Sequence, residues 1–142
     1  MMSLCCDVLK VLEGKTLVTA ESCTGGGIGA ALTAVPGSSA VYKGGIISYT
    51  NWVKEKLLDV DGDLLAQYGA VSAQVAEAMA ESARRQLQAD VAISVTGLAG
   101  PGGDDFGNPV GTVYIGYSEG NKLYAKKFLF SGDRETVRQK TT

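Results

Sequence analysis

The chain has 142 residues, of which 45% are hydrophobic and 20% are charged, with a net charge of −2 and no histidine. This length corresponds to one domain, and the apolar fraction is large enough to bury a core. The acidic balance excludes the global positive charge by which nucleic-acid binders attract phosphates, so we expect no nucleic-acid partner. Because histidine is absent, any acid–base chemistry must use another side chain.

Cysteine usage and hydropathy narrow the class of protein further. The three cysteines, Cys5, Cys6 and Cys23, form no Cys-x-x-Cys pair, so we expect neither a disulfide framework nor a zinc site. No segment approaches the roughly 18 apolar residues of a membrane span, and the first ten residues do not have the pattern of a signal peptide. The composition therefore favours a cytoplasmic enzyme or binding domain, without a metal, a cofactor or a membrane partner.

Hydrophobic spacing in the first third of the chain predicts alternating helices and strands. Apolar residues at helical spacing predict a helix over 4–12. A β-branched run predicts a strand over 16–20, followed by a glycine turn and a short helix. Residues 41–50 are typical of a second strand, in which Gly44 and Gly45 mark a bulge or a close backbone approach.

Two helices follow the second strand. Helical spacing resumes over 52–58. Ser72 is typical of an N-cap, and apolar residues at four-residue steps from Val75 to Leu87 predict a longer helix after it.

The last third of the chain predicts three strands and a helix. The nearly continuous apolar run 91–96 is typical of a strand covered on both faces, so it belongs at the sheet centre. Residues 110–117 and 123–130 predict an antiparallel hairpin, and cap residues followed by helix formers begin a final helix within 131–138, which we expect to be truncated. The order of elements predicts a single three-layer α/β/α domain over 1–142 with a mixed sheet.

The turn after the first strand is the first candidate for chemistry. Ser22 and Thr24 stand beside the expected start of a helix, and Gly25 and Gly26 follow them. Free N–H groups at a helix N-terminus bind phosphates or oxyanions. The alternative is a simple capped turn, in which one of the hydroxyls satisfies the helix.

The segment after the second strand holds the only side chain suited to act as a base. Tyr49 falls at the strand end and Lys54 on the first turns of the next helix. A lysine with a lowered pKa can deprotonate a serine hydroxyl without histidine, and a tyrosine can relay a proton or bind substrate. The alternative is that Lys54 is a solvated helix residue like Lys56.

A glycine-rich segment after the buried strand is the third candidate. The run from Thr96 to Gly103 offers backbone N–H groups at close range, although an ordinary connecting loop would have the same composition. Ligands of open α/β sheets bind beyond the carboxyl ends of the strands, so we expect the three turns to converge there.

Seven strings in order along the chain resemble the CinA C-terminal domain family, and together they cover it from about Thr16 to its end. They are AESCTGG (20–26), PGSS (36–39), GIISYTN (45–51) with Lys54, YGAVS (68–72), VTGLAGPGG (95–103), PVGTV (109–113) and FSGDR (130–134). Two departures stand out. Asp59 lies where relatives often have glycine, and the chain is short of the family's usual final helix.

The resemblance implies a nicotinamide mononucleotide deamidase, which hydrolyses the carboxamide to nicotinic acid mononucleotide and ammonia in pyridine nucleotide recycling. Ser22 would be the nucleophile, Lys54 its general base and Tyr49 a helper in proton transfer or substrate orientation. Arg134 would bind the substrate phosphate, in competition with Arg138. The residues expected to bind substrate are Thr24, Gly25, Gly26, Thr96, Gly97, Gly100 and Arg134.

A second class of function stays open, because a fold does not establish an activity. The domain could be a non-catalytic nucleotide-binding or regulatory module linked to competence or DNA damage. In either case we expect a homo-oligomer whose partner is a small molecule.

Overall fold

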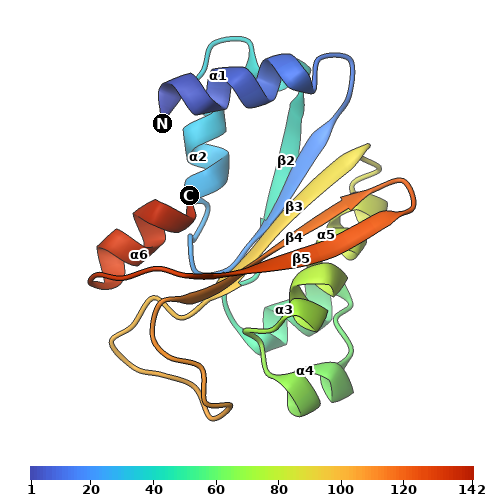
Figure 1. The fold of residues 1–142 in the computed structure, drawn as a ribbon. Coiled ribbons are helices and arrows are strands. Elements are labelled where there is room, and N and C mark those ends of the chain that lie inside the picture. The colour runs from blue at the N-terminus through green and yellow to red at the C-terminus, as the bar shows by residue number, and fades with distance from the viewer.

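A computed structural model describes all 142 residues as an α/β domain built on one mixed sheet (Figure 1). The strand order is β2-β1-β3-β4-β5; the first three strands run parallel, and β4 and β5 are antiparallel to their neighbours. The predicted apolar strand is β3, at the sheet centre. The strand bounds are β1 Leu17–Glu21, β2 Tyr42–Ile47, β3 Val91–Gly97, β4 Thr112–Glu119 and β5 Lys122–Leu129.

Helices cover both faces of the sheet, which confirms the predicted three-layer architecture. In Figure 1, α1, α2 and α6 lie on one side, whereas α3, α4 and α5 lie on the other. The bounds are α1 Met2–Val11, α2 Gly27–Thr33, α3 Asn51–Leu58, α4 Gly62–Tyr68, α5 Ala73–Gln86 and α6 Arg134–Thr141, with a short 3₁₀ turn at Ser38–Ala40. None of these helices combines the length and the apolar character that crossing a membrane requires.

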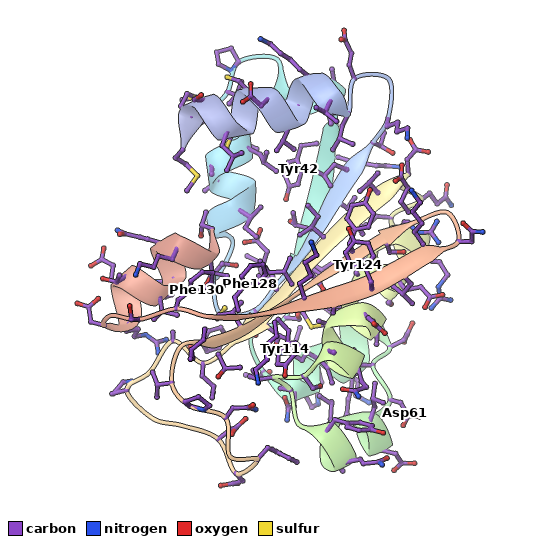
Figure 2. All side chains as sticks on the ribbon, viewed as in Figure 1. Tyr42, Asp61, Tyr114, Tyr124, Phe128 and Phe130 are labelled. Carbon is purple, nitrogen blue, oxygen red and sulfur yellow. The ribbon has the colours of Figure 1, made fainter.

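Side chains of β1 point alternately to the two faces of the sheet and contribute to a hydrophobic core on each face. Val18 and Ala20 pack against Met79 of α5, whereas Leu17 packs against Leu9 of α1. Successive strand side chains point to opposite faces, so a five-residue strand buried throughout serves both layers. A smaller cluster joins α6 to the sheet, where Phe130 lies beside that helix (Figure 2).

The longest helix, α5, is set against the sheet by polar contacts as well as by its apolar face. The Ser72 hydroxyl accepts a hydrogen bond from the Val75 N–H at 3.3 Å, which confirms the predicted N-cap. The Ser94 hydroxyl of β3 donates to the Ala76 carbonyl of α5. A side chain at Gly116 of β4 would overlap that same carbonyl, so glycine permits the close approach of helix and sheet.

The second strand is shorter than its sequence pattern predicts. It ends at Ile47, because Thr50 already begins the next helix, where its hydroxyl accepts from the Val53 N–H at 3.4 Å. The predicted irregularity at the glycine pair is confirmed, since the register with β1 shifts at this point and a side chain at Gly45 would overlap the Thr19 hydroxyl.

The seven-residue helix α4 has no counterpart among the predicted elements. The Asp61 carboxylate caps it by accepting from the Asp63 N–H at 2.9 Å, and Leu65 is buried on its inner side. Figure 2 places Asp61 away from the sheet. Two turns of helix are too short to produce a clear apolar period, so the hydrophobic spacing of the sequence did not predict this helix.

Asp59, one of the two departures from the family pattern, ends α3 in the left-handed region with φ of 50°. Only glycine enters this region without steric cost, although aspartate and asparagine tolerate it better than other residues. The conformation explains why glycine suits this position.

Candidate active site

The three predicted turns do converge at one edge of the sheet. Because β1, β2 and β3 run parallel, their carboxyl ends lie side by side, and the segments that follow them line a cavity of about 450 Å³. Arg134 of α6 adds a charged group to its wall. Among the residues that line it are Ser22, Tyr49, Lys54, Thr96, Gly97 and Gly100.

Lys54 and Ser22 form a buried pair at the base of this cavity. The Lys54 side chain is 1% exposed, and its Nζ lies 3.0 Å from Ser22 Oγ. The same Nζ donates to the Ser48 carbonyl at 2.7 Å and to the Tyr49 carbonyl at 3.4 Å. The solvated-lysine alternative is therefore wrong: α3 turns this residue inward, whereas Lys56 stays exposed.

Burial lowers the pKa of Lys54 to about 8, and no carboxylate pairs with it to reverse that effect. When Nζ loses a proton, the two remaining N–H groups can stay on the Ser48 and Tyr49 carbonyls. The lone pair then faces the Ser22 hydroxyl, which is the arrangement that general-base activation of a serine requires.

Cys23, the neighbour of Ser22, does not compete as a nucleophile. The residue is buried, and this burial raises the pKa of its thiol to about 11. A thiol is a good nucleophile only as the thiolate, so Cys23 is inert near neutral pH. The hydroxyl of Ser22 is the reactive oxygen that the geometry favours.

The helix N-terminus after this turn is occupied by the chain itself. The buried Glu21 carboxylate accepts hydrogen bonds from the N–H groups of Ile28 at 2.8 Å and Gly29 at 2.9 Å. It also accepts from the Thr24 hydroxyl at 2.7 Å and the Thr19 hydroxyl at 3.1 Å. The first turn of α2 is thus closed to a substrate anion.

The side chain of Thr24 and the residues Gly25 and Gly26 do not line the cavity that holds Ser22. The Thr24 side chain turns toward Glu21, and the two glycines adopt positive φ angles of 61° and 101°. Their role here is to let the chain reverse between β1 and α2. The family resemblance implied that these residues contact substrate, whereas here the Thr24 hydroxyl is hydrogen-bonded to Glu21.

Arg134 spans the mouth of the cavity. Its Nη1 donates to the Gly100 carbonyl at 2.7 Å, and its Nη2 donates to the Tyr49 hydroxyl at 2.6 Å. Tyr49 is 54% exposed, and its hydroxyl contacts Arg134 rather than Ser22 or Lys54. The structure therefore places Tyr49 beside the guanidinium at the rim.

The end of β3 forms another wall of the cavity. The buried Thr96 hydroxyl donates to the Ala70 carbonyl at 2.8 Å, and a side chain at Gly97 would collide with Val113 of β4. Beyond them, the backbone N–H groups of Gly102 and Gly103 donate to no group of the chain. This wall offers hydrogen-bond donors to a ligand, as the glycine-rich composition predicted.

Two charged residues near the site make contacts that the sequence did not predict. Glu21 stands inside the first family string, but a strand residue gives no sign that its carboxylate caps the next helix. Arg138 donates from Nε to the Cys23 carbonyl at 3.0 Å and from Nη2 to the Thr24 carbonyl at 3.3 Å. It lies outside the cavity, so only Arg134 of the two competing arginines faces the ligand space.

The fold and the site define an α/β protein with a buried serine–lysine pair at the carboxyl edge of its parallel strands. No group of three or more acidic, cysteine or histidine side chains is arranged to hold a metal ion. The chain belongs to the CinA family, because the model of the CinA C-terminal domain matches residues 3–142.

Relatives and solved structures agree with this assignment. The chain is 52% identical to a CinA-like protein of Parasynechococcus marenigrum strain WH8102 over 98% of its length, and 50% identical to one of Geobacter strain M21 over 89%. It spans about a third of those two relatives, 34% and 30% of their lengths.

Solved structures match the whole fold. Competence damage-inducible protein A of Klebsiella pneumoniae superposes with a TM-score of 0.96 at 37% identity, over 99% of this chain and 88% of that one. The competence/damage inducible protein CihA of Agrobacterium tumefaciens gives 0.94 at 38% identity, over 99% and 87%.

Proposed function

We propose that the chain is an amidohydrolase that converts nicotinamide mononucleotide to nicotinic acid mononucleotide and ammonia. The observation that carries the reaction class is the buried contact of 3.0 Å between Lys54 Nζ and Ser22 Oγ, at a lysine whose pKa is lowered to about 8. The family resemblance supplies the substrate. Pyridine nucleotide recycling is a cytoplasmic process, and we place the protein there, as a homo-oligomer.

In the first half-reaction, Ser22 Oγ attacks the carboxamide carbon while neutral Lys54 takes the hydroxyl proton. A tetrahedral intermediate forms, with negative charge on the former carbonyl oxygen. When it collapses, the carbon–nitrogen bond breaks and Lys54 returns the proton to the leaving nitrogen, so that ammonia departs. The product of this half-reaction is an ester between Ser22 and the nicotinate group.

In the second half-reaction, water replaces ammonia. Lys54 takes a proton from a water molecule that attacks the ester carbon, and the second tetrahedral intermediate expels Ser22 Oγ, which recovers the proton. Nicotinic acid mononucleotide leaves and the pair returns to its starting state. A single base serves both halves because its pKa of about 8 permits both protonation states near neutral pH.

The remaining groups of the cavity bind and orient the nucleotide in this proposal. Arg134 offers its guanidinium to the substrate phosphate, and Tyr49 beside it orients the nucleotide rather than relaying a proton to Ser22. Thr96, Gly97 and Gly100 form another part of the cavity wall, where the Gly100 carbonyl contacts Arg134. A volume of about 450 Å³ falls within the ordinary range of small-molecule sites.

The oxyanion of both intermediates needs hydrogen-bond donors. The backbone N–H groups of Cys23 and Thr24 follow the nucleophile directly, and neither donates to a group of the chain. The residue after the nucleophile supplies such a donor in other strand–turn–helix hydrolases. We assign these two N–H groups to the oxyanion.

The test is ammonia release from nicotinamide mononucleotide by the purified protein, with product identified by mass spectrometry. Ser22→Ala is the matched control, since it removes one hydroxyl and leaves the cavity in place. We expect turnover by the native chain and binding without turnover by the variant. Binding without ammonia release by the native chain would establish the alternative, a non-catalytic nucleotide-binding module.

A further inference from the structure

The peptide group between Cys23 and Thr24 is unusual in its hydrogen bonding. Thr24 is 2% exposed, yet its backbone N–H donates to no group of the chain. Buried backbone N–H groups are almost always paired, because leaving one unpaired costs about as much as a lost hydrogen bond. An unpaired donor directly after the nucleophile is explained if a ligand atom completes it.

The carbonyl of the same peptide accepts a hydrogen bond from a residue that lies outside the cavity. Arg138, half-buried on α6, donates from Nε to the Cys23 carbonyl at 3.0 Å and from Nη2 to the next carbonyl, that of Thr24, at 3.3 Å. A planar guanidinium makes these two contacts at once, which a lysine ammonium cannot do in the same fixed geometry.

Peptide planarity connects the two observations. In a trans peptide the C=O and N–H bonds point in opposite directions. By holding the Cys23 carbonyl toward α6, Arg138 therefore turns the Thr24 N–H away from α6. On its other side, the turn is fixed by Glu21, which accepts from the Thr24 hydroxyl at 2.7 Å.

We propose that Arg138 is a positioning residue that sets the Cys23–Thr24 peptide so that the Thr24 N–H points at the oxyanion formed when Ser22 attacks. This inference rests on the proposed hydrolysis. Arg138 does not line the cavity, so it acts through the backbone and does not touch the substrate. Its role differs from that of Arg134, which faces the ligand space.

The kinetic test compares Arg138→Met and Arg138→Lys with Lys140→Met, an exposed position on the same helix whose Nζ donates to the Ser131 carbonyl. Loss of one oxyanion donor typically lowers kcat by about 10²- to 10³-fold. We expect Arg138→Met to lower kcat by about 100-fold, with KM changed less than threefold. The kcat of Arg138→Lys should fall between that of Arg138→Met and that of the native chain. The kcat of Lys140→Met should match that of the native chain. A higher KM with unchanged kcat would overturn the proposal and make Arg138 a substrate-binding residue.

A structural readout separates this inference from the proposed function. Crystal structures of the native chain and of Arg138→Met should show the Cys23–Thr24 peptide rotated or disordered in the variant, whether or not nicotinamide mononucleotide is the substrate. A peptide that keeps its orientation without Arg138 overturns the positioning role. Absence of ammonia release by the native chain overturns the proposed function. In that case the orientation of the Cys23–Thr24 peptide in the two crystal structures still decides whether Arg138 positions it.

Discussion

Replacement of Lys54 by methionine tests the burial of the base without relying on any substrate. The lysine is 1% exposed and has no carboxylate partner, and its pKa falls from 10.5 to about 8 in the folded chain. At about 1.36 kcal/mol for each pKa unit, this difference amounts to about 3 kcal/mol. Since the unfolded chain binds the proton more tightly, the native protein should gain that stability, relative to Lys54→Met, as the pH rises from about 8 to about 10.5.

The assay is urea unfolding of the native chain and of Lys54→Met at pH 7 and at pH 10.5. Groups common to both proteins cancel in the difference between their free energies of unfolding, so the change in this difference reports Lys54 alone. A difference that stays constant to within about 0.5 kcal/mol over this range would mean that Lys54 keeps an ordinary pKa, and it would refute the reasoning.

The same shift predicts the pH dependence of the reaction. With a pKa of about 8, about 10% of Lys54 is neutral at pH 7, against about 0.03% at the ordinary pKa. Because the neutral form is the base, kcat/KM should rise with pH and level off above about 8. Lys54→Arg should be nearly as inactive as Lys54→Ala, since a guanidinium stays protonated. An active arginine variant would reassign Lys54 to substrate binding.

Four further outcomes follow from the structure. Ser22→Ala should lower kcat by at least about 10³-fold while circular dichroism and ligand affinity stay near native values; near-native turnover would exclude the covalent mechanism. A chelator should leave ammonia release unchanged, since no cluster of acidic or cysteine ligands surrounds the site, and activity restored by a divalent ion would contradict this. Asp59→Gly should raise the free energy of unfolding by about 0.5 kcal/mol by relieving a left-handed aspartate, with loss of stability as the opposing result. Gly116→Ala should destabilise the chain by about 1–3 kcal/mol, because its methyl group would push α5 off the sheet; a neutral effect in urea unfolding would show that α5 shifts freely.

The sequence predicted most of the fold because apolar periods are strong in the long elements. The central strand, the hairpin and the helix capped by Ser72 were all confirmed within a few residues. The pattern failed where local polar contacts decide the chain path. Thr50 ends the second strand by capping α3, and Asp61 begins a helix too short to show a period.

For the candidate site, the sequence located the segments but could not give the partners of each side chain. Ser22, Lys54 and Tyr49 do lie at the cavity, and the Lys54 contact with Ser22 agrees with the roles that the family resemblance implied. The hydrogen bond from Lys54 to the Ser48 carbonyl could not be predicted from the sequence, because every residue has a backbone carbonyl. The sequence left open whether the helix N-terminus binds an anion or is capped by a neighbouring hydroxyl, and only the folded chain shows that the Glu21 carboxylate fills it.

Helix α6 makes the site sensitive to local opening of the structure. It contributes Arg134 at the cavity mouth and Arg138 behind the nucleophile turn, yet only two of its residues, Val137 and Thr141, are buried. A segment with so few buried contacts opens at a lower free energy than the core strands. Detachment of α6 would remove both arginines in one step while the sheet stays folded. Catalysis should therefore disappear at a lower urea concentration than the far-ultraviolet circular dichroism of the sheet and α5.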